Sequence, residues 1–399
     1  MDTELENKQI GLYIHIPFCH TKCTYCDFNT YTGIENLIED FTKSICNEIE
    51  FWSFNNPYQI NSIFIGGGTP SYLEIEHLEK IIKKVTKNFD IAKNTEVTLE
   101  INPEDVTNDK ALLWEKIGIN RCSIGIQSLN DEELKLINRR HSASKAIESI
   151  NILKNYFKNI SVDLIYGLPN QNIKTYLETL EKIIQMNPSH ISAYSLQVEK
   201  GTFLNQQVSR KEVIIANDDI SAEMYKSTQR ILRKNKYKNY EISNWSKDEH
   251  FSEHNLKYWK LEPYIGVGPG AHSYMENKRF SVIKSPKKYI STINKISKQK
   301  ISSITEKTKY LKQVNFFEVY EEHNLKNEIL EFLMLSLRLD EGINLKEFKH
   351  RFNLDFDNLY LNKLKSYFSN NILEKNEDFY KLTNKGKLFA NEVANNFVD

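Results

Sequence analysis

The sequence predicts an α/β protein: an open, partial (β/α)6 barrel of the TIM type, followed by a small winged-helix-like C-terminal domain. Three observations lead to this prediction. Short runs rich in β-branched and aromatic residues alternate with longer stretches of helical periodicity as far as residue 196. Most of these runs are apolar on both faces, as strands covered by helices must be. Beyond residue 308 the alternation gives way to helices.

The barrel elements follow from this pattern in chain order. Strands are predicted at residues 12–16, 62–65, 96–101, 121–126, 161–166 and 191–196. Helices, with apolar residues three and four apart, are predicted at residues 34–54, 75–85, 109–117, 131–157 and 175–185. Alternating units of this kind imply a parallel sheet. Periodicity alone leaves open whether that sheet is a partial barrel or a doubly wound sheet.

The second half of the chain predicts a helix with a charged outer face at residues 210–236 and a strand at 264–267. Residues 284–300 are rich in Lys and Ser, show no clear apolar face, and indicate a connector. Helices at 328–338, 345–352, 356–368 and 384–396, with a hairpin at 372–382, predict the winged domain, although no strongly basic recognition helix is present. We therefore divide the chain into a barrel with a strand extension (1–283), a connector (284–310) and a C-terminal domain (311–399).

Composition excludes several classes of protein. Lys+Arg and Asp+Glu balance at 53 each, so no bulk charge favours nucleic acid. The N-terminal residues are acidic and polar, unlike a secretory signal. The most apolar run, 329–339, carries Glu331 and Arg338 and is shorter than the roughly 20 residues of a membrane span. Since the five cysteines form no disulfide framework, we expect a soluble, cytoplasmic protein.

Polar or glycine-rich segments lie where most of the predicted strands end. The carboxyl ends of parallel strands meet at one rim of a barrel, and that rim is where barrel proteins place their chemistry. We therefore expect one site built from all of these segments. They are the cysteine-rich stretch after the first strand, residues 66–70, 100–103, 125–128 and 195–197, and Asp163 within the fifth strand.

Cys19, Cys23 and Cys26 form a C-x3-C-x2-C array in the first of these segments. Soft thiolates bind iron–sulfur clusters, zinc or Cu(I). A [4Fe–4S] cluster usually takes four cysteines, so three would leave one iron open to another ligand. A structural zinc site closed by His15 or His20 is the alternative that the spacing leaves open.

The array C-x3-C-x-aromatic-C resembles the signature of radical S-adenosylmethionine (SAM) proteins. In that family SAM chelates the open iron of a [4Fe–4S] cluster, and an electron from the cluster cleaves it to methionine and a 5′-deoxyadenosyl radical. The resemblance extends over nearly the whole chain to the branch that contains oxygen-independent coproporphyrinogen dehydrogenases and HemW haem chaperones, including their HemN-type C-terminal domain. The matching runs are residues 13–28, 66–70, 121–128, 163–169, 241–245 and 266–273.

The resemblance assigns roles that the residues alone leave open. By themselves the glycines at 66–68 fit a tight turn as well as a ligand, Glu100 fits an ordinary strand end, and Arg139 fits a solvated helical charge. In the resembling branch Tyr13 and Gly67 would border the cluster-bound SAM and Glu100 would face its ribose. A second group matches positions that hold a second SAM in the dehydrogenase; whether one or two molecules bind here stays open. That group is Tyr25, Gly68, Thr69, Gln127, Arg139 and Asp163.

Residues 254–259, His-Asn-Leu-Lys-Tyr-Trp, resemble the haem-binding element of HemW proteins. An imidazole can ligate haem iron, and Tyr258 and Trp259 offer apolar faces to a porphyrin. The resemblance therefore implies His254 as an axial haem ligand. The alternative is that the element packs the following strand against the barrel. His250 and His254, four residues apart, are more typical of surface histidines than of a metal site.

Two departures separate the members of this branch. The dehydrogenase carries a further cysteine two residues after the third, where this chain has Phe28, and a long N-terminal arm, where this chain has a short segment. The combination resembles HemW, which implies a haem chaperone that delivers haem to acceptors such as respiratory cytochromes. It also implies an electron donor such as flavodoxin or ferredoxin, and membrane contact only through acceptors. The alternatives are a coproporphyrinogen III dehydrogenase and a zinc-stabilised binding protein.

Overall fold

The computed structural model describes residues 8–296 and 301–397. In these residues one large sheet has the strand order β12-β11-β10-β9-β1-β2-β3-β4-β5-β6-β8-β7. Its six central strands are parallel neighbours in chain order. A doubly wound sheet reverses its strand order at a switch point, so this order identifies an open partial barrel. The six strands are β1 (Gln9–Ile16), β2 (Gln59–Gly67), β3 (Ile91–Ile101), β4 (Arg121–Gln127), β5 (Asn159–Tyr166) and β6 (His190–Ser195).

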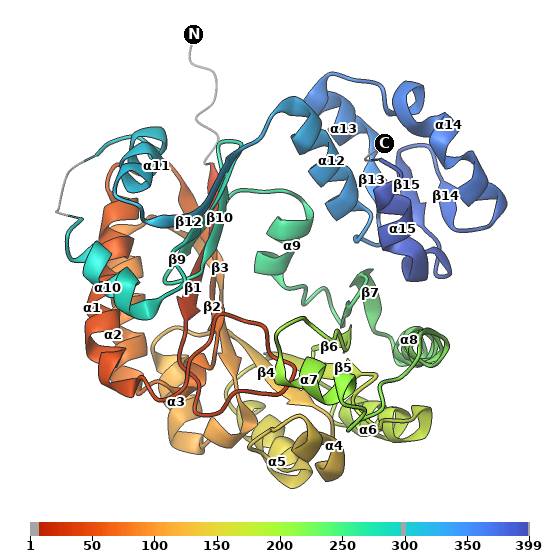
Figure 1. Ribbon diagram of the computed structural model, residues 1–399, viewed down its shortest axis with the longest axis horizontal. Coiled ribbons are helices and arrows are strands. Elements are labelled where there is room, and N and C mark those ends of the chain that lie inside the picture. The colour runs from red at the N-terminus through yellow and green to blue at the C-terminus, as the bar shows by residue number, and fades with distance from the viewer. Residues whose placement is uncertain (1–7, 297–300, 398–399) are drawn as a thin grey trace.

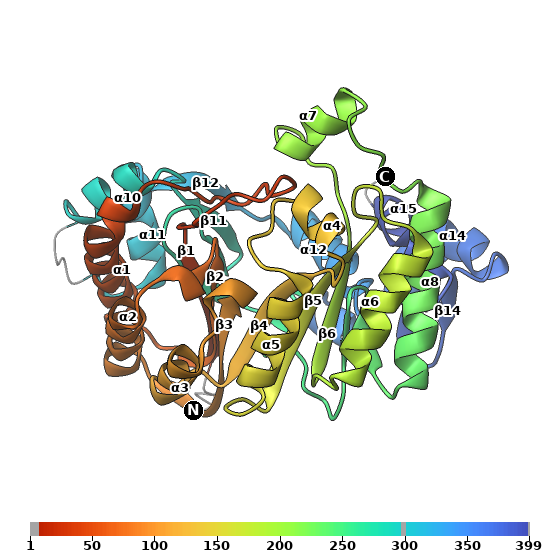
Figure 2. The same cartoon turned by 90° about the horizontal axis from the view of Figure 1, so that it is seen from below.

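Helices cover the outer face of these strands, as Figure 2 shows. Their apolar stripes join the strands in one core that includes Trp52, Trp114 and Tyr176. Burial of these side chains, together with the parallel ladder, holds the strand ends at a common rim. The helices are α1 (Ile38–Ser53), α2 (Ile75–Asn88), α3 (Asn108–Lys116), α4 (Asp131–Leu136), α5 (Ala143–Leu153), α6 (Ile173–Gln185) and α8 (Asp218–Lys234). Short 3-10 turns η1 (Glu35–Leu37), η2 (Pro70–Tyr72) and η3 (Pro103–Asp105) lie between them.

The single helix predicted over residues 131–157 is wrong, because the chain forms α4 and α5 with a break at 137–142. Asn138 adopts a left-handed φ of +57°, which ends the first helix. Ser142 then caps the second by accepting a hydrogen bond from the Lys145 amide. The predicted helix over 210–236 is also shorter than expected, since α8 begins at Asp218. A further short helix, α7 (Phe203–Ser209), was not predicted.

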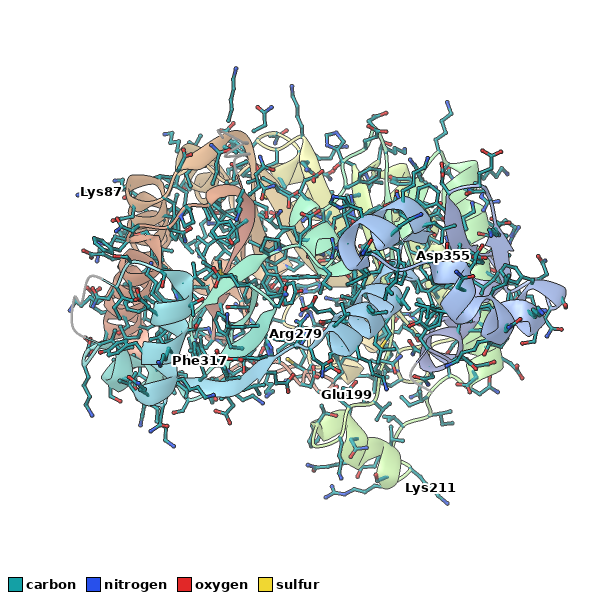
Figure 3. All side chains as sticks on the ribbon, turned by 90° about the horizontal axis from the view of Figure 1, so that it is seen from above. Lys87, Glu199, Lys211, Arg279, Phe317 and Asp355 are labelled. Carbon is teal, nitrogen blue, oxygen red and sulfur yellow. The ribbon has the colours of Figure 1, made fainter. Side chains whose placement is uncertain are left out.

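Residues 196–217, here called the α7 arm, project from the body of the protein (Figure 2). Figure 3 shows Glu199 at the base of the arm and Lys211 near its far end. The arm contacts the body through the Leu204 amide, which donates to the Thr24 carbonyl over 2.8 Å, and through the buried Leu204 side chain. The arm is therefore anchored to the segment that carries the cysteines.

The other strands extend the barrel on both sides: β7 (Lys238–Glu241) and β8 (Asn244–Ser246) beyond β6, and β9 (Tyr264–Val267), β10 (His272–Met275), β11 (Lys278–Val282) and β12 (Phe317–Glu322) beyond β1. No strand was predicted between residue 308 and the hairpin at 372–382, and this is wrong, since β12 joins the large sheet. The segment 284–300 was expected to lack an apolar face. It forms α10 (Pro286–Ile293), whose fully buried Tyr289 packs against α1, while residues 297–300 lie outside the described residues. α11 (Ile304–Gln313) follows.

The C-terminal domain lies beside α9 (Glu253–Trp259) and β7 (Figure 1). It has a small antiparallel sheet and its own core, which also includes Leu261, Tyr264 and Tyr274 of the barrel extension. The predicted winged architecture is confirmed, with the hairpin at β14–β15. None of the helices in the described part of the chain combines the length and apolar character that crossing a membrane requires. The elements are α12 (Leu325–Ser336), β13 (Ile343–Asn344), α13 (Leu345–Phe352), α14 (Phe356–Ser369), β14 (Leu373–Lys375), β15 (Phe379–Leu382), η4 (Gly386–Phe389) and α15 (Ala390–Asn395).

Candidate functional site: a thiol-lined cavity in the barrel

The cysteine loop, residues 17–31, leaves the end of β1 and folds back on itself. The Cys19 amide donates to the Tyr31 carbonyl over 2.9 Å, and the Tyr31 amide donates to the Pro17 carbonyl over 2.8 Å. Thr24 fastens the far side of the loop through its amide, which donates to the Ile137 carbonyl in the break after α4. This arrangement brings all three predicted cysteines, Cys19, Cys23 and Cys26, to the wall of one cavity of about 450 Å³ at the barrel rim.

Each of the three sulfurs has a polar neighbour. The Thr69 hydroxyl donates to Cys19 Sγ at 3.3 Å, Arg139 Nη1 donates to Cys23 Sγ at 3.5 Å, and Thr30 Oγ1 lies 3.9 Å from Cys26 Sγ. Burial raises the pKa of Cys19 to about 11 and also raises the pKa of Cys26. As free thiols Cys19 and Cys26 therefore keep their protons, and the neighbouring donors are placed to stabilise thiolates that bind a metal. Three cysteine thiols are the donor type and number of an iron–sulfur cluster with one open iron. In this conformation, however, no three His, Cys, Asp or Glu side chains of the described residues are gathered closely enough to hold a metal ion.

The glycine run after β2 is required by close packing against the end of β1. Gly67 has φ +114°, and a Cβ there would lie 2.5 Å from the His15 ring. A Cβ on Gly68 would lie 2.7 Å from the Phe18 carbonyl oxygen and 3.0 Å from Cys19 Sγ. The tight-turn interpretation of these glycines is thus sufficient for the fold. The same turn also places Gly67, Gly68 and Thr69 on the cavity wall.

Two carboxylates face the cavity from β3 and β5, the strands on either side of β4. Glu100 accepts a hydrogen bond of 2.9 Å from the Gly67 amide, and burial together with the charge of Asp163 raises its pKa to about 7. Asp163 accepts hydrogen bonds from the hydroxyls of Ser123 (2.8 Å) and Ser161 (3.1 Å). The pKa of Glu100 is therefore raised towards neutral pH, and the two serine hydroxyls fix the position of the Asp163 carboxylate.

Arg139 lies in the break between α4 and α5, which excludes the alternative interpretation of this residue as a solvated helical charge. Its Nη2 donates to the Gly125 carbonyl over 2.6 Å while Nη1 reaches Cys23. Gln127 adopts φ +67°, a left-handed conformation that non-glycine residues seldom use. Both side chains line the cavity, as does Tyr25.

Tyr13 and His15 lie behind the cavity wall. The Tyr13 hydroxyl is hydrogen-bonded to His15 Nδ1 at 3.0 Å, and the other ring nitrogen of His15 is bonded to the Asn29 carbonyl at 3.0 Å. Burial lowers the pKa of His15 to about 4. His15 therefore has no free nitrogen to close a zinc site in this conformation. His20 is exposed and packs edge-on against Tyr72.

His254 is fully buried at the base of the barrel. Its Nδ1 is bonded to the Ser62 hydroxyl and its Nε2 to the Tyr258 hydroxyl, both at 2.9 Å. Burial, with smaller effects from nearby cations, lowers its pKa to about 3. In this conformation the ring is a neutral structural group with both nitrogens bonded, and the predicted axial role requires a different position of α9.

The sequence reasoning missed several further residues that line the cavity. Those on the strands could have been found from the alternation of side chains, because they share the inward face with Glu100 and Asp163. Nothing in the sequence indicated the one on α9. They are Arg121, Ser123, Ser192, Tyr194 and Asn255.

Comparisons with known proteins agree with this site. A model of the radical SAM superfamily matches residues 13–183, and a model of the HemN C-terminal domain matches residues 324–389. The heme chaperone HemW of Buchnera aphidicola (subsp. Schizaphis graminum) is 33% identical, covering 98% of this chain and 98% of that protein. The HemW proteins of Haemophilus influenzae and Bacillus subtilis are 32% and 31% identical over 98% and 97% of this chain, and 98% of each relative.

The chain belongs to the HemW family of radical SAM proteins. Its fold is also that of coproporphyrinogen III oxidase HemN from Escherichia coli, with a TM-score of 0.81 at 20% identity over 98% of this chain and 90% of the other. At that identity the likeness concerns the fold alone. The expected partial barrel of radical SAM type is confirmed.

The cavity of this HemW-family chain collects most of the residues predicted to bind SAM. Phe28, at the position that separates the two members of the branch, lies at its edge and is 63% exposed. Tyr13 is the predicted residue that does not line the cavity; its ring stacks on Phe64, which does. The predicted residues on the wall are Tyr25, Gly67, Gly68, Thr69, Glu100, Gln127, Arg139 and Asp163.

Proposed function

We propose that this chain is a cytoplasmic haem chaperone that binds haem and passes it to acceptor proteins such as respiratory cytochromes. The observation that carries the proposal is its similarity, over nearly the full length of both chains, to proteins named heme chaperone HemW. The exposed Phe28 in place of a fourth cysteine further supports it over coproporphyrinogen decarboxylation.

In this proposal Cys19, Cys23 and Cys26 hold a [4Fe–4S] cluster, and the cavity beside them holds SAM. When bound, the cluster supplies an electron and one iron that SAM can chelate. Arg139 holds the Cys23 sulfur and the end of β4 together, which keeps the cysteine loop over the cavity. Glu100, fixed by the Gly67 amide, offers its second carboxylate oxygen to a ribose hydroxyl. A small electron donor of the flavodoxin or ferredoxin class would serve the cluster.

Haem ligation by His254 belongs to the proposal as a second conformation. The ring must leave the Ser62 and Tyr258 hydroxyls, and α9 must move away from Glu96, which accepts from the Glu253 and His254 amides at 3.2 Å. Breaking these hydrogen bonds costs free energy, which raises the barrier to haem binding. We therefore expect haem binding through His254 to be slow compared with diffusion.

The test is anaerobic reconstitution with iron and sulfide, followed by two separate incubations. One adds haem and records its absorption band; the other adds coproporphyrinogen III, SAM and a reductant and analyses the porphyrin. We expect stoichiometric haem and no decarboxylated product. Production of protoporphyrinogen would instead establish the dehydrogenase, and a colourless protein with one zinc per chain would establish the zinc-stabilised alternative.

His254→Gln tests the haem ligand in the same assay. Gln keeps a polar side chain between the two hydroxyls but lacks the imidazole, so the protein should fold and lose the haem band. His250→Gln, a change at a half-buried histidine four residues away, is the matched control. Full haem binding by His254→Gln would reject the assignment.

A further inference from the structure

The cavity continues past the residues predicted to bind SAM towards the N-terminal ends of the strands. In the sheet register Glu100 pairs with Ser123, and Arg121 pairs with Thr98, two residues earlier on the same strands. Arg121 therefore lies one inward-facing layer deeper in the barrel than Glu100. At this depth α9 closes the barrel, and its Asn255 faces the cavity. Arg121 and Asn255 are here called the cavity floor.

Arg121 is a buried cation with spare hydrogen-bonding capacity. It is only 2% exposed, yet it borders the cavity. Its Nη1 makes a long bond of 3.5 Å to Thr98 Oγ1, and its Nε lies 3.7 Å from Glu96 without a hydrogen bond. Among the residues that the structure describes, no group accepts a hydrogen bond from its Nη2. A buried guanidinium with unused donors is costly unless a ligand completes its bonding.

The surrounding groups do not supply that ligand. Glu96 forms a buried ion pair with Arg121, but both of its oxygens accept hydrogen bonds from the amides at the start of α9 instead. Asp163 is held by two serine hydroxyls. Glu100 bonds the Gly67 amide in the layer above. The nearby imidazoles of His190 and His254 are bonded to hydroxyl groups on both ring nitrogens and are not anions. The unused donors of Arg121 thus point to an anionic group that enters with a ligand.

We propose that the cavity floor is a carboxylate-binding subsite, in which Arg121 and Asn255 bind a propionate-type carboxylate of the porphyrin cargo. The inference rests on the proposed function and specifies where the cargo is held. A guanidinium and a carboxylate match in planar geometry, and the amide of Asn255 can donate to the same group.

The experiment compares haem with haem dimethyl ester, in which both propionates are neutral. The protein carries its reconstituted cluster and saturating SAM, and each ligand is titrated under argon while the porphyrin absorption band is followed. The measured quantity is the ratio of the two dissociation constants. We expect wild-type protein to prefer the diacid by about tenfold, the size of one charge-assisted hydrogen bond.

Three variants test whether the cavity floor causes the preference for haem over its dimethyl ester. Asn255→Ala and Arg121→Lys should each reduce the ratio severalfold. The double variant Glu96→Gln with Arg121→Gln removes both charges of the pair, so neither is left unpaired in the core, and should bring the ratio to about one without changing ester affinity. Arg230→Lys, at an exposed arginine of α8, is the matched control and should keep the wild-type ratio. Circular dichroism verifies that each variant is folded.

The outcomes separate the two proposals. Wild-type protein that binds both forms equally, or prefers the ester, overturns the subsite and leaves the chaperone proposal intact. An unchanged ratio in the double variant likewise overturns the subsite. If wild-type protein binds neither form, both the chaperone function and the subsite are rejected.

Discussion

Glu48 of α1 provides a sharp test of how the barrel supports its rim. Its carboxyl group is 1% exposed; Oε2 accepts hydrogen bonds from the Gly268 amide (2.8 Å) and the Tyr289 hydroxyl (2.7 Å), and Oε1 accepts one from Trp52 Nε1 (3.4 Å). The loop that starts at Gly268 in turn contacts the cysteine loop, because Asn29 Nδ2 donates to the Pro269 carbonyl over 2.8 Å. Burial raises the pKa of Glu48 from 4.5 to about 7.

The direction of the pH effect follows from this shift. The unfolded chain loses the Glu48 proton from pH 4.5 upward, whereas the folded protein keeps it until about pH 7. The stabilisation is complete below pH 4.5 and is lost as the pH rises to 7. The whole pKa shift corresponds to about 3.4 kcal/mol of the free energy of unfolding. The part of this contribution that is lost above pH 5.5 is about 2 kcal/mol.

Glu48→Gln removes the titration and keeps an oxygen for the Gly268 amide and the Tyr289 hydroxyl. Relative to wild type, the variant should therefore gain about 2 kcal/mol in free energy of unfolding between pH 5.5 and pH 8.0. Urea denaturation of the cluster-free protein at both pH values measures this difference. The other titrating groups contribute equally to wild type and variant, so their effects cancel in the comparison. Glu181→Gln, at an exposed glutamate of α6, is the matched control. A difference that stays constant between the two pH values refutes the burial argument.

Three further predictions concern the site itself. Arg139→Gln should lower the iron retained per chain after gel filtration under argon, because Cys23 loses its cationic donor; iron retention at the wild-type level would contradict this role. Gly67→Ala should destabilise the protein by more than the roughly 1–2 kcal/mol of left-handed strain alone. The control Gly118→Ala has that strain (φ +99°) with open space around the new methyl group, so equal thermal shifts would contradict the packing argument. Ser62→Ala should lower the free energy of unfolding, measured by urea denaturation, by about 1–3 kcal/mol, because it leaves a buried imidazole nitrogen of His254 unpaired. The control Ser246→Ala removes a buried hydroxyl without a partner and should be neutral. Equal effects of the two changes would show that the Ser62 hydrogen bond contributes nothing.

Much of the site could be predicted because parallel strands bring their carboxyl ends to one rim whatever the details of packing. Cys19, Thr69, Glu100 and Asp163 follow from that rule together with the family motifs. The position of Arg139 could not be predicted from periodicity, because the apolar spacing continues through residues 131–157 while Asn138 turns left-handed between the two helices. Ser142 caps the second helix, and tertiary contacts decide whether such a cap or the local helix propensity prevails.

The α10 segment shows a second limit of sequence reasoning. Because the segment is rich in Lys and Ser, its apolar face was not recognised in the sequence. That face is buried and consists of Pro286, Tyr289, Ile290 and Ile293. Tyr289 has its place because Glu48, far away in the sequence, accepts a hydrogen bond from its hydroxyl group. Such a pairing between distant elements has no periodic signature, so only the folded chain shows that this segment supports the barrel.

His254 and Asn255 are adjacent on α9, and the structure uses them in opposite ways. His254 is sealed against Ser62, while Asn255 faces the cavity. Consecutive residues of a helix point about 100° apart, so rotating α9 to present His254 to the cavity turns Asn255 away from it. Ligation of haem iron by His254 and carboxylate binding at the cavity floor therefore belong to different positions of α9. The C-terminal domain holds α9 in the present one, since Arg338 stacks over the Trp259 ring at 4.6 Å, so displacement of that domain should exchange carboxylate binding for iron ligation.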